Sequence, residues 1–232
     1  MTELEHRPRT APAAAPLPAR TAVVGCGRMG SALVQAALSQ GLEVVAGVRG
    51  HQVRRPGVPP GVAQMEPREA VAEAELVVLA VPPGLPLREA AEDLRPALAG
   101  KVVVELSNPL MRWRGMPAPR GPFGPSEAER LAQRLPRARI AKALNTVSAK
   151  ALRRIGTVGP SADDHRVSVP VAADDPEARR TVCAWVEALG FDSVPAGPLT
   201  QARSLEHLAQ LLCHIDMEAG RTGLVGCRIV RP

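Results

Sequence analysis

A glycine motif between a strand-like run and a helix-like run most constrains what this chain can fold into. Four residues of strand character, Thr21 to Val24, lead directly into Gly25-x-Gly27-x-x-Gly30, and an amphipathic helical pattern follows at once. Gly25 permits a tight turn, Gly27 has no Cβ to block phosphates, and Gly30 lets the helix lie close to the strand. This order sets a pyrophosphate on a helix N-terminus, so it predicts a dinucleotide-binding βαβ unit. A glycine-rich turn in another βαβ unit is the alternative.

Strand-like and helix-like segments alternate along the rest of the chain, which predicts an α/β fold with a doubly wound parallel sheet. Further strands are expected at 43–47, 76–81, 101–106, 138–142, 167–173 and 191–195, and helices at 67–74, 86–98, 127–135, 174–189 and 200–219. Pro170 predicts that its strand lies at a sheet edge. Residues 1–20 are rich in Ala and Pro without periodicity, so we expect a disordered tail.

The composition of the 232-residue chain argues against several classes of protein. No apolar run reaches the roughly 18 residues of a membrane span, and no signal peptide is apparent, so no membrane association is expected. The four cysteines form no CxxC pair, which favours reduced thiols in a cytoplasmic protein without a metal site. The net charge of +6 is spread along the chain and aromatics make up only 2%, so no nucleic-acid partner is expected. The absence of tyrosine excludes a Tyr–Lys proton donor.

The end of the second strand predicts which dinucleotide binds. An acidic residue at this position binds the ribose 2′-hydroxyl of NAD, whereas an arginine accommodates the 2′-phosphate of NADP. No acid occurs between Gly47 and Arg55, but Arg49, Arg54 and Arg55 do. Guanidinium groups match phosphate geometry well, so the sequence favours NADP, with Arg49 best placed. For Arg54 and Arg55 an ordinary solvated loop is an equal alternative.

Polar residues, prolines and glycines follow several predicted strands. They lie at the carboxyl ends of these strands, where open α/β sheets bind ligands. Asn108 is a candidate contact to the nicotinamide side of the cofactor, or else part of a simple Asn-Pro turn. The long loop 111–125, which contains Trp113, has the length of a functional lid. Ser126 and Glu129 have the spacing of a capping box that starts the next helix.

Together, several stretches resemble the NADPH-dependent reductases of the deazaflavin coenzyme F420 and the similar cytosolic domain of six-transmembrane ferric reductases. The most specific are Lys142-Ala-Leu-Asn-Thr-Val-Ser148 and Gly197-Pro-Leu-Thr-Gln-Ala-Arg203. The others are Val24–Gly30, Ala46–Arg49, Ala80–Pro82, Ser107–Pro109, Ser126–Glu129, Gly190–Phe191 and Leu205–Glu206.

The resemblance implies a Rossmann domain at 21–145, a smaller C-terminal α/β domain at 146–232 that contributes to the acceptor pocket and the dimer interface, and a homodimer. It implies hydride transfer between NADP(H) and a flavin-like ring, with F420 as co-substrate. In such a reaction the protein acts mainly by positioning the two rings, and not through a side-chain acid. The implied cofactor-binding residues are Gly25, Cys26, Gly27, Arg28, Met29, Gly30, Arg49, Ala80, Val81, Pro82 and Asn108, to which we add Arg54 and Pro109 from their positions in the sequence. The implied substrate pocket contains Asn145, Thr146 and Val147, to which we add Trp113.

Two departures from the family pattern leave the acceptor open. Val48 stands where the family commonly has a serine, which removes one hydroxyl from the phosphate site. The 111–125 loop is not a shared feature and could reshape the acceptor pocket. The alternatives are therefore a reductase of a small imine, ketone or enone, or a nucleotide-binding protein without a redox step.

Four further features have both a functional and a plain structural interpretation. His207 and His214 lie seven residues apart on one helix face and could form a proton relay or metal pair, although partial burial or a dimer interface is favoured. Cys26 lies beside a helix N-terminus, which would lower its pKa, yet a small residue fitted to a turn is favoured. Arg203 and Glu206 have the spacing of a local ion pair. Lys142 is structural at its strand end, or else catalytic.

Overall fold

The computed structural model describes residues 16–50, 55–109, 111–113, 116–118, 124–158 and 166–230. Its strands are β1 (Thr21–Val24), β2 (Val44–Gly47), β3 (Gln64–Met65), β4 (Leu76–Leu79), β5 (Val102–Glu105), β6 (Met111–Trp113), β7 (Met116–Ala118), β8 (Arg139–Lys142), β9 (Ser168–Ala173) and β10 (Asp192–Gly197). Its helices are α1 (Arg28–Ser39), α2 (Pro67–Ala72), α3 (Leu85–Leu98), α4 (Glu127–Arg134), α5 (Ala149–Val158), α6 (Pro176–Ala188), the 3₁₀ turn η1 (Leu199–Gln201) and α7 (Ala202–Glu218).

Eight strands form one sheet in the order β10-β9-β8-β5-β4-β1-β2-β3. The strands from β3 to β8 in this order are all parallel and follow the 3-2-1-4-5-6 arrangement of dinucleotide-binding sheets. β9 pairs antiparallel with β8, and β10 pairs parallel with β9. The predicted Rossmann-type α/β fold is confirmed, with the correction that the sheet is mostly, and not wholly, parallel.

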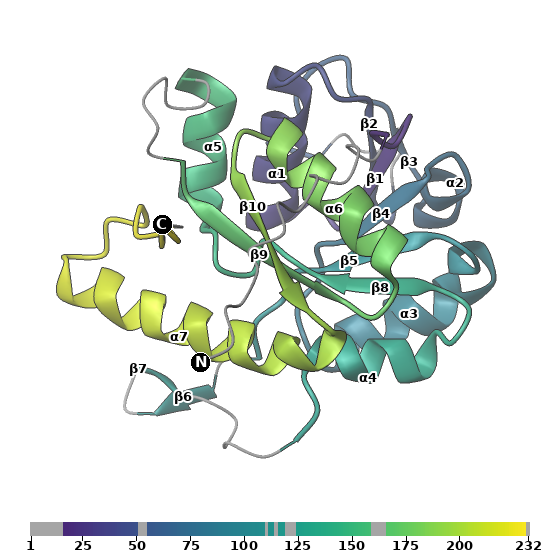
Figure 1. Ribbon diagram of the computed structural model, residues 1–232. Helices are drawn as coiled ribbons and strands as arrows, with labels where there is room; N and C mark the ends of the chain where they lie inside the picture. The colour runs from purple at the N-terminus through teal and green to yellow at the C-terminus, as the bar shows by residue number, and fades with distance from the viewer. Residues whose placement is uncertain are drawn as a thin grey trace, which may run out of the picture.

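Helices cover both faces of the sheet, as Figure 1 shows. One core cluster joins α1, α5 and α6 to one face and includes the fully buried Leu33, Leu152 and Trp185. The other joins α2, α3, α4 and the start of α7 to the opposite face and includes the buried Leu98 and Leu131. The strands β1, β2 and β4 are buried along their whole length and form nearly continuous apolar runs, and this is why they were recognisable from the sequence.

The strands and helices expected from the sequence agree with the structure to within two residues at each end. Four elements of the described residues were not predicted: the short strand β3, the helix α5 that packs against α1, and the strands β6 and β7. The capping box is confirmed, because Ser126 Oγ accepts from the backbone N–H of Glu129 and the Glu129 carboxylate accepts from the N–H of Ser126.

The expectation of an edge strand at Pro170 is wrong, since β9 lies between β8 and β10. The ladder between β8 and β9 includes only Ala172 and Ala173 of β9. Pro170 therefore lies beyond the part of β9 that pairs with β8, where a missing N–H breaks no ladder bond with that strand.

The predicted 111–125 loop contains a two-stranded antiparallel hairpin, β6–β7, which lies against α7 (Figure 1). The predicted division at residue 145 stays a prediction, and the strands β9 and β10 that follow it extend the same sheet as β1 to β8. Of the predicted tail, residues 1–15 lie outside the described residues, whereas Ala19 and Arg20 bond to Glu75 and Glu73. Among the described residues no helix has the length and apolarity needed to cross a membrane.

The glycine motif places α1 unusually close to β1. A Cβ added at Gly30 would lie 1.8 Å from the carbonyl oxygen of Gly25, whereas one added at Gly27 would meet nothing within 4 Å. Gly25 itself has φ +92°, which an L-residue rarely adopts. Only a glycine at position 30 therefore lets the first turn of α1 rest on the loop.

We expect Gly30→Ala to lower the free energy of unfolding by about 2 kcal/mol or more, because the new methyl group forces α1 away from the loop. Gly27→Ala is the matched control and should cost less than about 1 kcal/mol, since only the weaker N-cap preference of alanine acts there. Urea denaturation followed by circular dichroism measures both. Equal losses in the two variants would show that the close approach at Gly30 does not limit the packing.

Candidate functional site

A cleft of about 680 Å³ opens at the carboxyl ends of β1, β2 and β4. It lies at the switch point of the sheet, where chain connections leave in opposite directions and open α/β sheets bind their ligands. Its lining consists of residues 24–27 of the glycine loop, 47–49 and 55 after β2, 66–68 at the start of α2, 81–82 after β4, and 86, 89, 90, 93 and 94 of α3.

The glycine loop forms the floor of this cleft. The N–H of Gly25 donates to the carbonyl of Gly47 at 3.0 Å, and the N–H of Ala80 donates to the carbonyl of Val24 at 2.8 Å. These bonds continue the sheet up to the turn and fix the start of α1. The open space where a Gly27 Cβ would stand leaves the loop backbone accessible, so the cradle fits a pyrophosphate.

Three arginines and three carboxylates line the cleft: Arg49, Arg55, Arg68, Glu66, Glu89 and Asp93. Arg49 forms an ion pair with Asp93 at 2.6 Å, and both side chains are more than half exposed. Arg68 Nε donates to the carbonyl of Asp93, and Arg55 donates to the carbonyl of Arg49. The sequence from Gly47 to Arg55 contains no acid, but folding brings Glu66, at the N-cap of α2, and Glu89 and Asp93 of α3 to this place.

The structure brings together many of the predicted cofactor residues. Gly25, Cys26, Gly27, Arg49, Val81 and Pro82 line the cleft. Arg28, Met29 and Gly30 form the first turn of α1 behind the loop, and Ala80 packs beneath Gly30. Arg54 lies outside the described residues. Asn108 and Pro109 follow β5 and do not line the cleft.

Sequence reasoning missed the contribution of α2 and α3 to the cleft. Arg68 lies beside Arg49 in space but follows it by 19 positions, and Asp93 follows it by 44 positions. Neither residue belongs to a motif, so only the folded topology identifies them.

The expectation of a lowered Cys26 pKa is wrong. Burial raises the pKa of the thiol to about 11, and the nearby Arg55 offsets this only in part. Desolvation of the thiolate therefore outweighs the helix N-terminus. Cys26 is a small residue in a tight loop, as the structural interpretation held.

A second group of polar residues lies at the carboxyl ends of β5 and β8. Asn145 Nδ2 donates to Asn108 Oδ1 at 3.0 Å, and Asn108 Nδ2 donates to the carbonyl of Asn145 at 2.7 Å. Asn145 Nδ2 also donates to the carbonyl of Leu205 on α7. The amides of the two asparagines thus form a reciprocal pair that joins β5, β8 and α7.

Several polar atoms near this pair lack a partner. Among the described residues, Ser107 Oγ, Asn145 Oδ1 and Thr146 Oγ1 are buried without a hydrogen bond. Buried polar groups are rarely left so, because each costs about 1–3 kcal/mol. Leu144, just before Asn145, has φ +60°, a strained conformation for a branched residue. Orphaned polar atoms beside a strained backbone are typical of a binding site.

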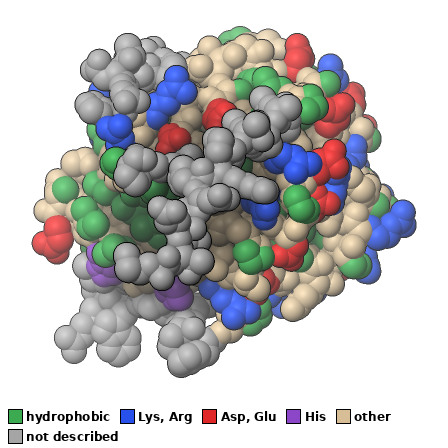
Figure 2. Space-filling view, in the orientation of Figure 1, with side chains coloured by type: hydrophobic (Ala, Val, Ile, Leu, Met, Phe, Trp, Pro, Cys, Tyr) green, Lys and Arg blue, Asp and Glu red, His purple; other side chains and the backbone are tan. Residues whose placement is uncertain are grey.

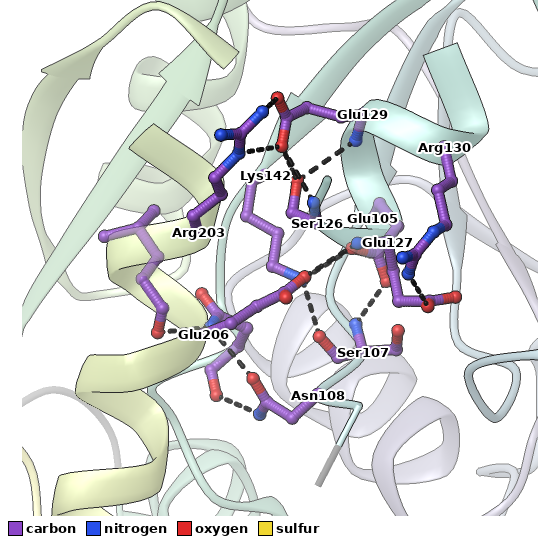
Figure 3. A network of polar contacts seen from close by, with 12 residues as sticks. Glu105, Ser107, Asn108, Ser126, Glu127, Glu129, Arg130, Lys142, Arg203 and Glu206 are labelled. Atoms are coloured by element: carbon purple, nitrogen blue, oxygen red, sulfur yellow. Dashed lines mark hydrogen bonds and ion pairs between the residues drawn. The ribbon is translucent and has the colours of Figure 1, made fainter. Parts of the chain in front are cut away.

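The buried ammonium of Lys142 lies next to this group (Figure 3). Its Nζ donates to Glu105 Oε2 at 2.6 Å, to the carbonyl of Ser107 at 2.6 Å and to Glu206 Oε1 at 3.0 Å. Glu105 is fully buried as well, and Glu206 is nearly so. Burial raises the pKa of Glu206, and the opposing attraction of Lys142 offsets this only in part.

The predicted ion pair between Arg203 and Glu206 is wrong. Arg203 instead binds Glu129 with two hydrogen bonds of 2.8 and 2.7 Å, while Glu206 faces Lys142 (Figure 3). Although partial burial opposes it, the bonds from Arg203 and Ser126 lower the pKa of Glu129. Helical spacing permitted the local pair, but α4 and the strand end of β8 offer stronger partners.

His207 and His214 lie on α7 and do not line the cleft. Within the part of the chain that the structure describes, no group of three or more His, Cys, Asp or Glu side chains could hold a metal ion. Trp113 lies on β6 of the hairpin, and Thr146 and Val147 are buried after β8.

Comparison with known proteins relates this geometry to a family. The family model described as NADP oxidoreductase, coenzyme F420-dependent, matches residues 20–109. The metalloreductase STEAP3 of Rattus norvegicus is 32% identical over 191 residues, which are 81% of this chain and 36% of that protein. The chain thus spans about a third of the length of this curated relative.

Solved structures extend the comparison. A protein of Arthrobacter sp. FB24, described as an F420-dependent NADP-reductase, superposes with a TM-score of 0.77 at 30% identity, over 91% of this chain and 99% of that one. An imine reductase of Streptomyces aurantiacus superposes with a TM-score of 0.64 at 20% identity, over 86% of this chain and 63% of that one, which is a likeness of fold.

The match to the Arthrobacter protein is the most informative, because it covers nearly the full length of both chains. The family model covers the glycine loop and Arg49, which line the cleft. The protein therefore belongs to the family of coenzyme F420-dependent NADP oxidoreductases.

Proposed function

We propose that the protein transfers a hydride between NADPH and the deazaflavin coenzyme F420. The observation that carries this proposal is the 30% identity, over 99% of its length, to a protein described as an F420-dependent NADP-reductase. Bound NADPH supplies the hydride from its nicotinamide ring. The protein supplies position, because no tyrosine is present to act as an acid beside a lysine.

In this proposal the cleft holds the nucleotide. The loop from Gly25 to Gly30 binds the pyrophosphate at the start of α1, and Arg49 binds the 2′-phosphate with Arg55 and Arg68 beside it. Val81 and Pro82 border the ribose. The charged side chains of the lining sum to zero, and a bound phosphate would replace Asp93 as the partner of Arg49.

The acceptor ring then lies at the carboxyl ends of β5 and β8. The orphaned oxygens of Ser107, Asn145 and Thr146 are hydrogen-bonding groups for the nicotinamide carboxamide or for the acceptor ring. The Asn108–Asn145 pair keeps the amides oriented, and the β6–β7 hairpin with Trp113 borders the acceptor side. This arrangement supports stacked rings held at a fixed distance, which is the main requirement of hydride transfer.

The proposal includes a homodimer formed through α7. Leu208, Leu211 and Ile215 share one face of this helix, and the last two are 56% and 45% exposed. Figure 2 shows hydrophobic side chains gathered over this side of the molecule. Exposed apolar groups of this kind favour protein contacts.

The proposal also includes a cytoplasmic location. The four cysteines, all of which are described, are free thiols, as in a reducing compartment.

The direct test combines the purified protein with NADPH and F420. We expect NADPH-dependent loss of the F420 absorbance with a turnover number between about 1 and 10³ s⁻¹. NADPH carrying deuterium on one face of C4 should transfer its label from that face only. Absence of turnover at saturating concentrations would contradict the F420 assignment. Label transfer to an imine, ketone or enone would then identify the alternative reductase, and no transfer to any acceptor would indicate a binding protein.

Arg49→Glu tests recognition of the 2′-phosphate. We expect the Kd for NADPH to rise about 10- to 100-fold, because a charge-assisted hydrogen bond is worth about 1.5–3 kcal/mol. The Kd for NADH should change by less than about 3-fold. Asp93→Asn is the matched variant at the other end of the ion pair, and it should tighten NADPH by up to about 5-fold, as expected for an exposed pair. Calorimetry or nucleotide fluorescence measures these three dissociation constants against those of the wild-type protein. Equal effects of Arg49→Glu on both nucleotides would show that Arg49 does not contact the phosphate.

Leu211→Glu tests the dimer. A charge at the centre of the apolar face should convert a dimer of the wild-type protein into a monomer in size-exclusion chromatography with light scattering. Leu38→Glu, on α1 and 42% exposed, is the control and should leave the dimer intact. A monomeric wild type, or dissociation by both variants, would contradict an interface on α7.

A further inference from the structure

We infer that Lys142 is a positioning residue for hydride transfer, whose buried ammonium fixes the two chain segments that hold the Asn108–Asn145 pair. The inference rests on the proposed function, because it concerns the geometry of the same site.

Lys142 is not available as an acid or as a ligand to the acceptor. An ammonium group has three N–H donors, and all three are used by Glu105, Ser107 and Glu206. The side chain is fully buried, at 0% exposure. A donor so occupied acts on the site only through the groups that it holds.

The first group held is the backbone of Ser107. Its carbonyl accepts from Lys142 Nζ, and its N–H donates to Glu105 Oε1 at 2.6 Å. Glu105 Oε2 in turn accepts from Lys142. Both polar backbone groups of Ser107 are therefore fixed by one ion pair, and Asn108 is the next residue along the chain.

The second group held is the start of α7. Glu206 Oε1 accepts both from Lys142 Nζ and from the N–H of Glu127, at 3.0 Å each. The preceding residue, Leu205, offers its carbonyl to Asn145 Nδ2 at 2.8 Å. Lys142 thus sets the position of α7 relative to β8, and with it the third partner of the asparagine pair (Figure 3).

The charges explain why a neutral side chain cannot replace Lys142. Two carboxylates, Glu105 and Glu206, face one ammonium inside the protein. Without the cation, two buried negative charges would repel each other, and each would have to take up a proton or move toward water. Either response shifts the segments that carry Asn108 and Leu205.

Lys142→Met is the first test, and Lys101→Met is its matched control. Lys101 also donates its Nζ to backbone carbonyls, those of Ala72 and Ala74, but it lies at the opposite, amino end of β5. Hydrogen exchange by mass spectrometry should show about 10-fold faster exchange in the segments 105–109 and 202–208 of Lys142→Met. The segment 21–34 should be unchanged, and Lys101→Met should alter none of the three.

Kinetics supply the second readout. For Lys142→Met we expect kcat with F420 to fall about 100-fold, as a misplacement of about 1 Å can cause. The Kd for NADPH should change by less than about 3-fold, because the nucleotide cleft does not include the lysine. A lysine with only a structural role would reduce the folded fraction and leave the kcat of the folded protein unchanged.

Two substitutions at Glu206 keep the inference testable if Lys142→Met does not fold. Glu206→Gln removes the charge but keeps an oxygen that can accept from Lys142 and from the N–H of Glu127. Glu206→Leu removes both the charge and the acceptor. We expect a kcat within about 3-fold of wild type for Glu206→Gln, and a fall of about 10-fold or more for Glu206→Leu.

Equal kcat values for the two Glu206 variants would overturn the inference, because keeping the hydrogen-bond acceptor in Glu206→Gln would then make no difference. Unchanged exchange together with unchanged kcat in Lys142→Met would also overturn it. Failure of the proposed function is recognised separately, in the wild-type protein, as the absence of NADPH-dependent F420 reduction. The exchange measurements require no acceptor and still decide whether Lys142 holds the two segments.

Discussion

The close approach of α1 to the loop after β1 is the constraint on which the rest of the structure depends. A single methyl group at Gly30 would overlap the carbonyl of Gly25, so the helix can lie where it does only because no side chain intervenes. The position of α1 directs its first turn at the cleft and lets α5 pack behind it. The same contact brings Ala80 of the β4 end beneath the loop. Binding geometry and helix packing are thus set by one contact, which is why the glycine motif is so informative in the sequence.

A single sheet connects the cleft with the proposed acceptor end. Neighbouring parallel strands end at one edge, so the glycine loop, the turn after β4, Asn108 and Asn145 follow strands that lie next to one another. The antiparallel strand β9 lets the chain return across the sheet, and α7 then crosses to meet β8 through Glu206. The glycine loop depends on local turns, whereas the proposed acceptor end depends on contacts between elements far apart in sequence. The two ends are therefore expected to respond differently to substitution.

This difference also explains how much the sequence could predict. The glycine loop, the main buried strands and the Ser126–Glu129 capping box depend on residues within a few positions of one another, and the structure confirms them. The pairing of Arg49 with Asp93 and of Lys142 with Glu206 joins residues 44 and 64 positions apart, and no local pattern marks them. Arg203 was assigned to the nearest acid on its helix, but it binds Glu129 across 74 positions. For Cys26 the sequence indicated a helix N-terminus but not the depth of burial, and burial decides its pKa.

The equal number of arginines and carboxylates in the cleft has a consequence for how a nucleotide arrives. A lining of zero net charge exerts little long-range attraction on a polyanion, so encounter is not strongly steered by the cleft itself. Arg49 already bonds to Asp93 through Nη2. In the proposed binding mode an incoming phosphate therefore competes with that carboxylate for the guanidinium. Under the proposed function, recognition then includes an exchange of anions on a preassembled cation. Such an exchange weakens overall binding, but it penalises a nucleotide that has no phosphate to offer in return.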